Sequence, residues 1–161
     1  MISDSNTKPV KTAILLLNMG GPESASEVHP YLNELFQDKE LLKLPLQKIL
    51  GNFIAWRRTP FIQQRYEELG QYSPTRRIME EQGQKIAALL DESSPETAPH
   101  VCVPGFRYAV PRTGDELERF HDAERIILFS HYPQHSCSTS GSSLCDAYRW
   151  LNENPGLQNK I

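Results

Sequence analysis

The fold of this chain is decided by the stretch Lys11–Pro22, which reads KTAILLLNMGGP. Five apolar residues run without alternation over Ala13–Leu17, a pattern typical of a strand that is buried on both faces. The turn residues Gly20–Pro22 then stop the strand before a helical pattern begins. A strand, a glycine turn and a helix open an α/β domain, and such domains bind ligands at the carboxyl ends of their strands. Met19 and the glycines therefore lie at a candidate ligand edge, although the glycines could equally serve only to make the turn.

Size and composition narrow the class of protein. At 161 residues the chain is long enough for one domain with a substantial core. Its mean hydropathy is -0.51, and no apolar run approaches the length of a membrane span. A net charge of -3 argues against general binding of nucleic acid. The three cysteines are an odd number without a C-x-x-C pair, which indicates a reducing compartment.

Strand and helix patterns alternate along the rest of the chain. Two further strands are predicted, one at 100–108 that Pro104 and Gly105 should bulge or shorten, and one at 124–129. Helical patterns are predicted at 28–36, 46–56, 60–69, 74–90, 114–120 and 144–151. Pro30 should delay or bend the first helix, and Thr59-Pro60 should begin a new one. We expect an α/β domain at 11–154, with three or four parallel strands flanked by helices, a disordered tail at 1–10 and a tail at 155–161.

Two features of residues 46–77 indicate a ligand or a membrane. Between Lys48 and Arg77 there are six cations and only two carboxylates, which indicates either an anionic ligand or membrane surface or a solvated helix face. The predicted helix at 46–56 is unusually apolar and ends in Arg57-Arg58. Such a stripe either packs into the core or lies at a membrane interface with its cations beyond it.

Several residues could carry chemistry. Arg58, Tyr66 and Ser73 are hydrogen-bond donors that together suit carboxylates, or else they are a surface arginine, a core tyrosine and an ordinary helix cap. The hydroxyl-rich turn Ser138–Ser143 could hold an anion or simply start a helix. His131, His135 and Cys137 have the close spacing of metal ligands, but a metal site needs more ligands than these.

Taken together, these residues resemble ferrochelatase, the family of enzymes that insert ferrous iron into protoporphyrin IX to give haem. The matching motifs follow one another in the family's order over about residues 11–150. They are Leu17–Pro22, Leu44-Pro45, Arg57–Pro60, Tyr66 with Ser73-Pro74, Gly105–Tyr108 with Pro111, and Tyr132–Ser143.

The resemblance implies a fold and a set of site residues. The fold would be a chelatase of two Rossmann-like halves around a porphyrin cleft, and this chain would be the first half. The residues that would contact porphyrin or lie near the metal are Arg58, Tyr66, Ser73, Met19, Leu35, Leu41, Arg107 and Tyr108. The apolar helix at 46–56 would touch the membrane.

The resemblance also implies partners that this sequence does not supply. Cys137 matches the first of four cysteines that hold a 2Fe-2S cluster in animal-type ferrochelatases, and one thiolate cannot hold such a cluster. The family's proton-abstracting histidine belongs to a Ser-x-His-Ser type motif, which none of the five histidines here matches. We therefore expect iron insertion to need a second half, and a chain without it to self-associate through exposed apolar surface or to form a homodimer.

Family resemblance places the protein at the matrix side of the mitochondrial inner membrane, although residues 1–9 read as neither a signal nor a transit peptide. Two alternatives to the enzyme stay open. One is an inactive porphyrin- or haem-binding relative that is complete as it stands. The other is a generic α/β module that binds an anion at Ser138–Ser143.

Overall fold

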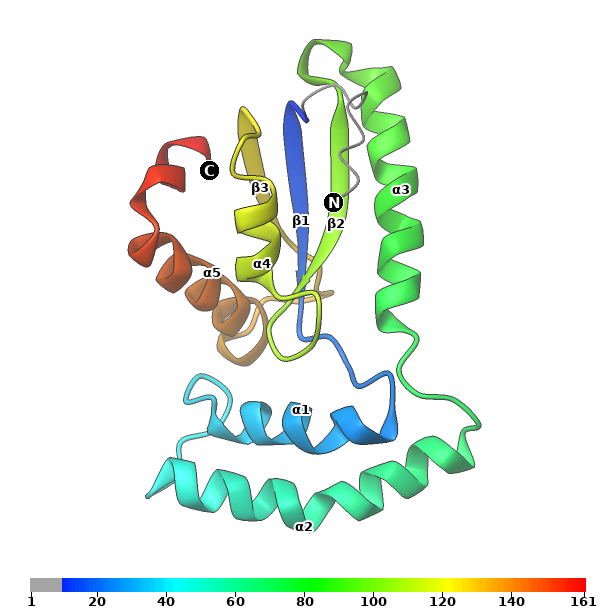
Figure 1. Cartoon of the computed structure of the whole chain (residues 1–161), viewed down its shortest axis with the longest axis vertical. Coiled ribbons are helices and arrows are strands. Elements are labelled where there is room, and N and C mark those ends of the chain that lie inside the picture. Colours follow the sequence, from blue (N-terminus) through cyan, green and yellow to red (C-terminus); the bar gives the residue numbers. More distant parts are fainter. Residues whose placement is uncertain (1–9) are drawn as a thin grey trace, which may run out of the picture.

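The computed structural model describes residues 10–161, and Figure 1 shows how their elements are arranged. The strands are β1 (Thr12–Asn18), β2 (His100–Phe106) and β3 (Arg125–Ser130). The α-helices are α1 (Ala25–Gln37), α2 (Gln47–Glu68), α3 (Thr75–Ser93), α4 (Thr113–Arg119) and α5 (Ser142–Glu153). Short turns of other helix types are η1 (Pro95–Thr97), η2 (Cys137–Gly141) and η3 (Pro155–Lys160). The tail expected at 1–10 lies outside the described residues, except for its last residue.

The three strands form one parallel sheet in the order β2-β1-β3. Ala13 of β1 lies opposite Val101 of β2 and Ile126 of β3, so the apolar stretch of β1 runs through the middle of the sheet. The chain crosses to one side of β1 and then to the other, which puts helices on both faces. The expected α/β, Rossmann-like class with three parallel strands is therefore confirmed.

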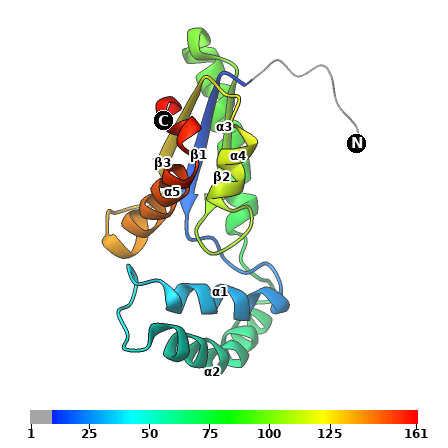
Figure 2. The same cartoon turned by 60° about the vertical axis from the view of Figure 1, so that its left-hand side comes forward.

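Alternate residues of β1 build two cores, one on each face of the sheet. Figures 1 and 2 show α3 on one side of the strands and α5 on the other. The α3 side buries Ile14, Leu16, Met79, Cys102 and Phe106. The α4 and α5 side buries Ala13, Leu15, Leu17, Leu117, Phe120, Ala123, Ile126, Ala147, Leu151 and Leu157. These two separate packing layers explain why the central strand is apolar on both faces.

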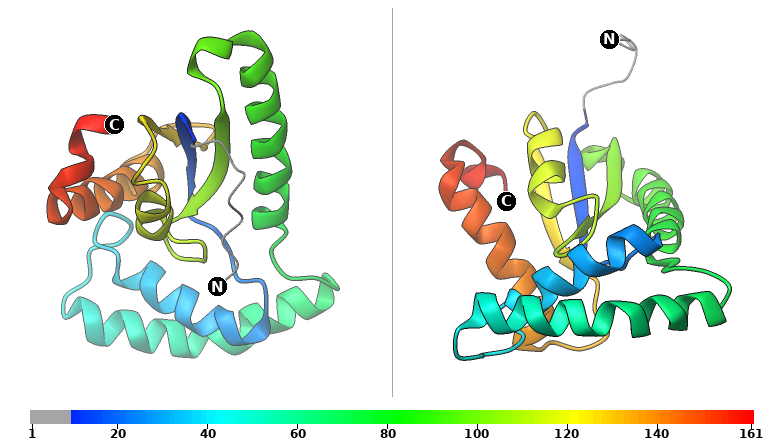
Figure 3. Two further views of the ribbon diagram at one scale, coloured as in Figure 1. Left: turned by 45° about the horizontal axis from the view of Figure 1, so that its top comes forward. Right: turned by 60° about the horizontal axis from the view of Figure 1, so that its bottom comes forward.

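Helices α1 and α2 form a hairpin beneath the carboxyl ends of the strands (Figures 1 and 3). We call residues 25–68 the helical hairpin. It has a core of its own, in which Val28, Leu32 and Ala55 are buried. Gly51 lets the two helices approach closely, since a Cβ there would lie 2.9 Å from the carbonyl oxygen of Phe36. The hairpin is therefore a unit that is attached to the sheet rather than part of its two cores.

Within this hairpin one prediction about proline was wrong, and one of the two alternatives given for Pro30 was wrong as well. The break expected at Thr59-Pro60 is absent, and α2 continues through it as one helix. The hydroxyl of Thr59 donates to the carbonyl of Ala55 at 2.8 Å. The carbonyl of Trp56, which Pro60 leaves without a donor, belongs to the exposed side of the helix, where water can donate to it. Likewise α1 begins at Ala25 and carries Pro30 at an exposed position, so its start is not delayed.

Two further boundaries differ from expectation. β2 continues through Pro104, because it is the outer strand of the described sheet and an edge strand tolerates a proline. The segment expected as a tail at 155–161 forms η3, and its Leu157 is only 7% exposed in the core beside α5. No helical or strand periodicity marks so short a turn, which explains why the sequence did not predict it.

β3 is an outer strand of the sheet, and two of its apolar side chains are not covered by the described residues. Ile127 is 40% and Phe129 is 50% exposed, on the face of the sheet that α3 covers over β1 and β2. An uncovered edge with such residues favours association. The exposed surface agrees with the expectation of self-association, which stays a prediction.

The close approach of α3 to β2 at Gly83 yields a test of the fold. A Cβ at Gly83 of α3 would lie 2.3 Å from the carbonyl oxygen of Cys102 in β2. We expect Gly83→Ala to lower the free energy of unfolding by about 1–3 kcal/mol despite the better helix propensity of alanine, because a backbone carbonyl cannot move aside. Urea unfolding measures this change. Gly156→Ala is the control, because its Cβ would meet nothing within 4 Å; equal effects of the two variants would contradict the packing described.

Candidate functional site

The glycine turn after β1 lies directly against the loop that follows β2. The backbone N–H of Arg107 donates to Asn18 at 2.9 Å, and that of Tyr108 donates to Met19 at 3.1 Å. Gly20 has a φ of +79°, and a Cβ there would lie 2.6 Å from that of Ala109. Only glycine accommodates both conditions. The structure therefore brings Met19, Arg107 and Tyr108 together at the carboxyl edge of the sheet.

One buried carboxylate connects the helical hairpin to this edge. Asp38 follows the last residue of α1, and its side chain is 5% exposed. Its Oδ2 atom accepts the hydroxyl of Tyr108 at 2.6 Å and that of Ser142, and it pairs with Nη2 of Arg107 at 3.3 Å. Arg107 also pairs with Asp146 of α5 at 3.2 Å. Burial alone would raise the pKa of Asp38, but the hydrogen bonds from Ser142 and Tyr108 outweigh it, so that the pKa lies below its usual value.

A second set of contacts fastens the hairpin to the loop after β2. Glu34 of α1 and Arg112 form a two-pronged ion pair, in which Nη1 lies 2.6 Å from Oε2. The hydroxyl of Tyr31 donates to the carbonyl of Gly20 at 3.3 Å, and its ring meets that of Tyr108 edge to face. Burial raises the pKa of Tyr31 to about 12. These bonds are polar and directional, so they fix the angle at which the hairpin meets the sheet.

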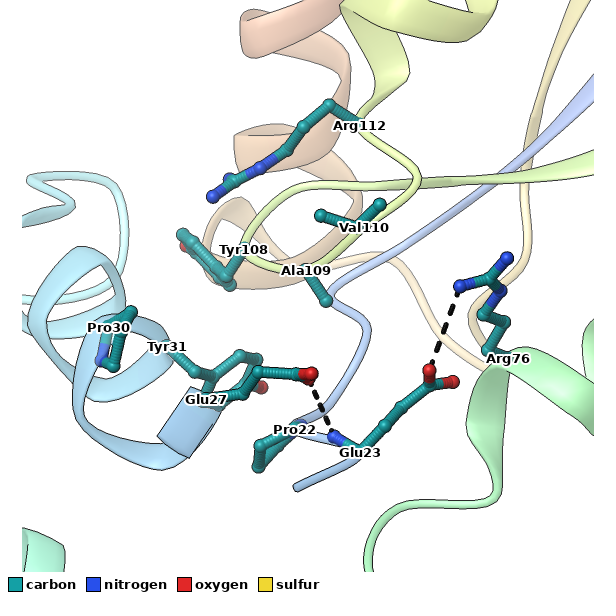
Figure 4. Close-up of a pocket in the computed structure, with 10 residues that line it drawn as sticks. All are labelled: Pro22, Glu23, Glu27, Pro30, Tyr31, Arg76, Tyr108, Ala109, Val110 and Arg112. Atoms are coloured by element: carbon teal, nitrogen blue, oxygen red, sulfur yellow. Dashed lines mark hydrogen bonds and ion pairs between the residues drawn. The ribbon is translucent and has the colours of Figure 1, made fainter. Parts of the chain in front are cut away.

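A cavity of about 360 Å³ lies between the hairpin, the glycine turn and the loop after β2. Figure 4 shows the side chains that line it, including Tyr31, Tyr108 and Arg112. Across the cavity Arg76 pairs with Glu23 at 3.7 Å, as the dashed line in Figure 4 marks. The described structure thus has a hollow at the edge where the sequence predicted a ligand site.

The three predicted donors are only partly brought together. Ser73 lies against the glycine turn, since its Oγ would be 2.4 Å from a Cβ at Gly21. The ring of Tyr66 stacks on that of Tyr72, the residue before Ser73, with 5.1 Å between centroids. Arg58 lies about 12 Å from Tyr66 along the axis of α2, and its guanidinium sits over the ring of Phe36. No hydrogen bond joins Arg58 to Tyr66 or Ser73 within the described residues.

The remaining residues predicted to line a porphyrin site lie on the same hairpin. Leu35 packs against the core of the hairpin, and Leu41 is half-buried in the loop between α1 and α2. Ser73 is not the cap residue of α3, which starts at Thr75, but its Oγ accepts the N–H of Thr75 at a long 3.4 Å. Contacts of these residues with a ligand stay a prediction.

The apolar stripe of α2 is exposed rather than buried. Leu46, Ile49, Phe53 and Trp56 are 73%, 67%, 57% and 63% exposed, and their spacing puts them on one side of the helix. This settles that the stripe is not core. None of the helices in the part of the chain that the structure describes is long and apolar enough to span a bilayer. The stripe is therefore a surface feature.

The five arginines of the basic segment divide into two groups. Arg65, Arg76 and Arg77 pair with carboxylates on their own helices. Arg57 and Arg58, at the end of the apolar stripe, have no carboxylate within ion-pair distance in residues 10–161. These two cations are available to an anion.

Two alternative sites receive little support from the geometry. Three or more metal-binding side chains do not gather anywhere in the described residues, so His131, His135 and Cys137 form no metal site there. The hydroxyls at Ser138–Ser143 bond within the protein: Ser142 donates to Asp38, and Ser143 shares a hydrogen bond with Tyr132 at 2.8 Å.

Cys137 is an exposed, free cysteine at the start of η2. The 2Fe-2S cluster that the resemblance implies needs four protein ligands. The described residues do not supply such a set around any cysteine. The chain's own residues therefore do not fit the cluster.

The sequence did not predict a role for Asp38, Glu34 or Arg112. Each pairs with a residue about 70 or more positions away, as in Asp38 with Tyr108 and Glu34 with Arg112. No local pattern distinguishes them from surface charges at the end of a helix. Their only signal is the tertiary contact itself.

The parallel sheet, the glycine turn at its carboxyl edge and the ligand-sized hollow there define an open α/β ligand-binding domain. The family model for ferrochelatase matches residues 11–160. The chain therefore belongs to the ferrochelatase family.

Three relatives show how far the similarity extends. The chain is 50% identical to the mitochondrial ferrochelatase of Bos taurus over 150 residues, which is 92% of this chain and 36% of that protein. It is 51% identical to that of Xenopus laevis, over 94% of this chain and 37% of the relative. For the Homo sapiens protein the identity is 48%, over 94% and 36%. The chain thus spans just over a third of the length of the curated relatives it matches.

The ion pair between Glu34 and Arg112 yields a test of how the hairpin docks. We expect Glu34→Arg or Arg112→Glu alone to lower the free energy of unfolding by about 1 kcal/mol, and the charge-swapped double variant to recover most of it. Chemical unfolding of the four proteins measures the coupling. The same swap at Arg77 and Glu81, an exposed pair on one helix, is the control and should show much weaker coupling. Equal coupling at both pairs would contradict a docking role.

Proposed function

We propose that this chain forms the porphyrin-binding part of a ferrochelatase of haem biosynthesis, with protoporphyrin IX and ferrous iron as substrates of the whole enzyme. The observation that carries the proposal is the family match together with the hairpin laid across the carboxyl edge of the sheet. A flat apolar ring with carboxylate arms needs aromatic and apolar surface beside hydrogen-bond donors. Arg58 and Tyr66 of the hairpin and Ser73 beside the glycine turn are the donors that we assign to the carboxylate arms.

The chemistry of insertion divides between binding and proton removal. Iron replaces two pyrrole protons, so a base must accept them while the ring is held and distorted. The residues that we assign to holding the ring are Arg58, Tyr66, Ser73, Met19, Leu35, Leu41, Arg107 and Tyr108. We assign no residue of this chain to the base, because none of its five histidines lies in the family's motif.

We further propose that the protein is mitochondrial, because its relatives are named so, and that it works at the matrix side of the inner membrane. The exposed stripe of α2 supports contact with a lipid surface, since apolar side chains with cations beyond them suit the headgroup boundary. A substrate that dissolves poorly in water would reach the site from that surface. A cluster at Cys137 would require ligands from other residues of the protein.

Porphyrin binding tests the main proposal. Titration of the chain with protoporphyrin should shift the Soret band, and Arg58→Ala should weaken binding by about tenfold, since a charge-assisted hydrogen bond to a carboxylate is lost. Arg57→Ala is the matched control, because it removes the same charge at the neighbouring position and Arg57 is not among the residues that we assign to the ring. Absence of a Soret shift at micromolar porphyrin, or equal effects of both variants, would contradict the assignment.

Membrane contact is tested by sedimentation with lipid vesicles. The double variant Phe53→Ser/Trp56→Ser should reduce the bound fraction severalfold, because two large apolar side chains no longer enter the headgroup region. Leu89→Ser on α3 is the control, since that leucine is 65% exposed but isolated from the stripe. Vesicles of phosphatidylcholine with phosphatidylglycerol should bind more protein than phosphatidylcholine alone if Arg57 and Arg58 contribute. Unchanged binding of the double variant would rule out the stripe as the contact.

A further inference from the structure

The porphyrin contacts proposed above leave one feature unexplained, which is the buried carboxylate of Asp38. A buried charge is unfavourable unless it is paired and hydrogen-bonded. Here the partners come from distant parts of the chain, Tyr108 and Arg107 after β2 and Ser142 at the start of α5. A carboxylate that serves only to end a helix would not need three such partners.

The geometry shows what this carboxylate controls. Three donors converge on Oδ2, while Oδ1 accepts the backbone N–H of Glu40 at 2.8 Å. Both oxygens are thus occupied inside the protein, and Asp38 does not itself face a ligand. Tyr108, by contrast, lines the cavity beside the glycine turn, and Arg107 lies with its guanidinium over the Tyr108 ring at 5.0 Å. Asp38 therefore determines the direction of Tyr108, which lines the cavity, and of Arg107 beside it.

We propose that Asp38 is a positioning residue for porphyrin binding, which fixes the orientation of the Tyr108 ring through its hydroxyl and holds Arg107 between two carboxylates. The identity of the ligand rests on the proposed function. The effect on Tyr108 and Arg107 stands on their contacts alone, so the two can be tested separately.

The charges around the cluster support this assignment. Arg107 lies between Asp38 and Asp146, and Arg149 approaches Asp146 at 3.5 Å. Burial, and then the hydrogen bond to Asp38, raise the pKa of the Tyr108 phenol. Without the Asp38 charge, burial still acts but one cause of the raised pKa is lost. The pKa of Tyr108 should therefore fall in Asp38→Asn.

A double-mutant cycle in the porphyrin titration separates positioning from mere structure. Asp38→Asn should weaken porphyrin binding by about tenfold, while Asp122→Asn, the same change at an exposed site, should have an effect below about twofold. If Asp38 acts through Tyr108, Asp38→Asn/Tyr108→Phe should bind no more weakly than Asp38→Asn alone, within about twofold. Losses that simply multiply in the double variant would overturn the proposal.

A measurement without porphyrin keeps the claim independent of the proposed function. In protein labelled with ¹³C at tyrosine Cζ, with Tyr108 assigned by Tyr108→Phe, Asp38→Asn should shift the Tyr108 Cζ resonance at neutral pH, because the phenol no longer donates to a carboxylate. An unchanged Tyr108 resonance overturns the positioning role whether or not porphyrin binds. If the wild-type chain gives no Soret shift, the proposed function is wrong. The NMR measurement still decides whether Asp38 positions Tyr108.

A milder variant covers the case in which Asp38→Asn does not fold. Ser142→Ala keeps the carboxylate and removes one donor from the same oxygen. It should weaken porphyrin binding by about two- to threefold while circular dichroism shows an intact fold. An intact Ser142→Ala protein with unchanged porphyrin binding and an unchanged Tyr108 resonance would overturn the proposal.

Discussion

The arrangement of this protein depends on how a helical hairpin with its own core is held against a parallel sheet. Apolar packing stabilises each part separately, because the hairpin core and the two sheet cores do not merge. The joint between them is made by polar groups, chiefly the buried carboxylate of Asp38 and the ion pair of Glu34 with Arg112. Hydrogen bonds and ion pairs are directional, so they set an angle that apolar contact alone would leave free. The shape of the candidate site follows from that angle.

Much of the fold could be predicted because its signals are local. An apolar run over Ala13–Leu17 followed by a glycine turn permits few structures besides a central parallel strand. The helix break expected at Pro60 does not occur. There α2 continues because both of its halves pack against α1. The same holds for Pro104, which a strand at the edge of the sheet can accommodate.

The candidate site was predictable only in part. Motif resemblance pointed to Met19, Arg107 and Tyr108, and the backbone bonds between the glycine turn and the loop after β2 bring these residues together. Asp38 was not predictable, because an aspartate after a helix usually lies at the surface. Its importance arises from partners far away in the sequence. Resemblance transfers the residues that face a ligand more readily than those that hold them in place.

The separate core of the hairpin has a consequence for the energetics of the native state. A unit that shares little apolar surface with its neighbour can detach without unfolding the neighbour, at a free energy below that of global unfolding. Amide hydrogens in α1 and α2 should accordingly exchange with solvent as one cooperative group, sooner than those of β1.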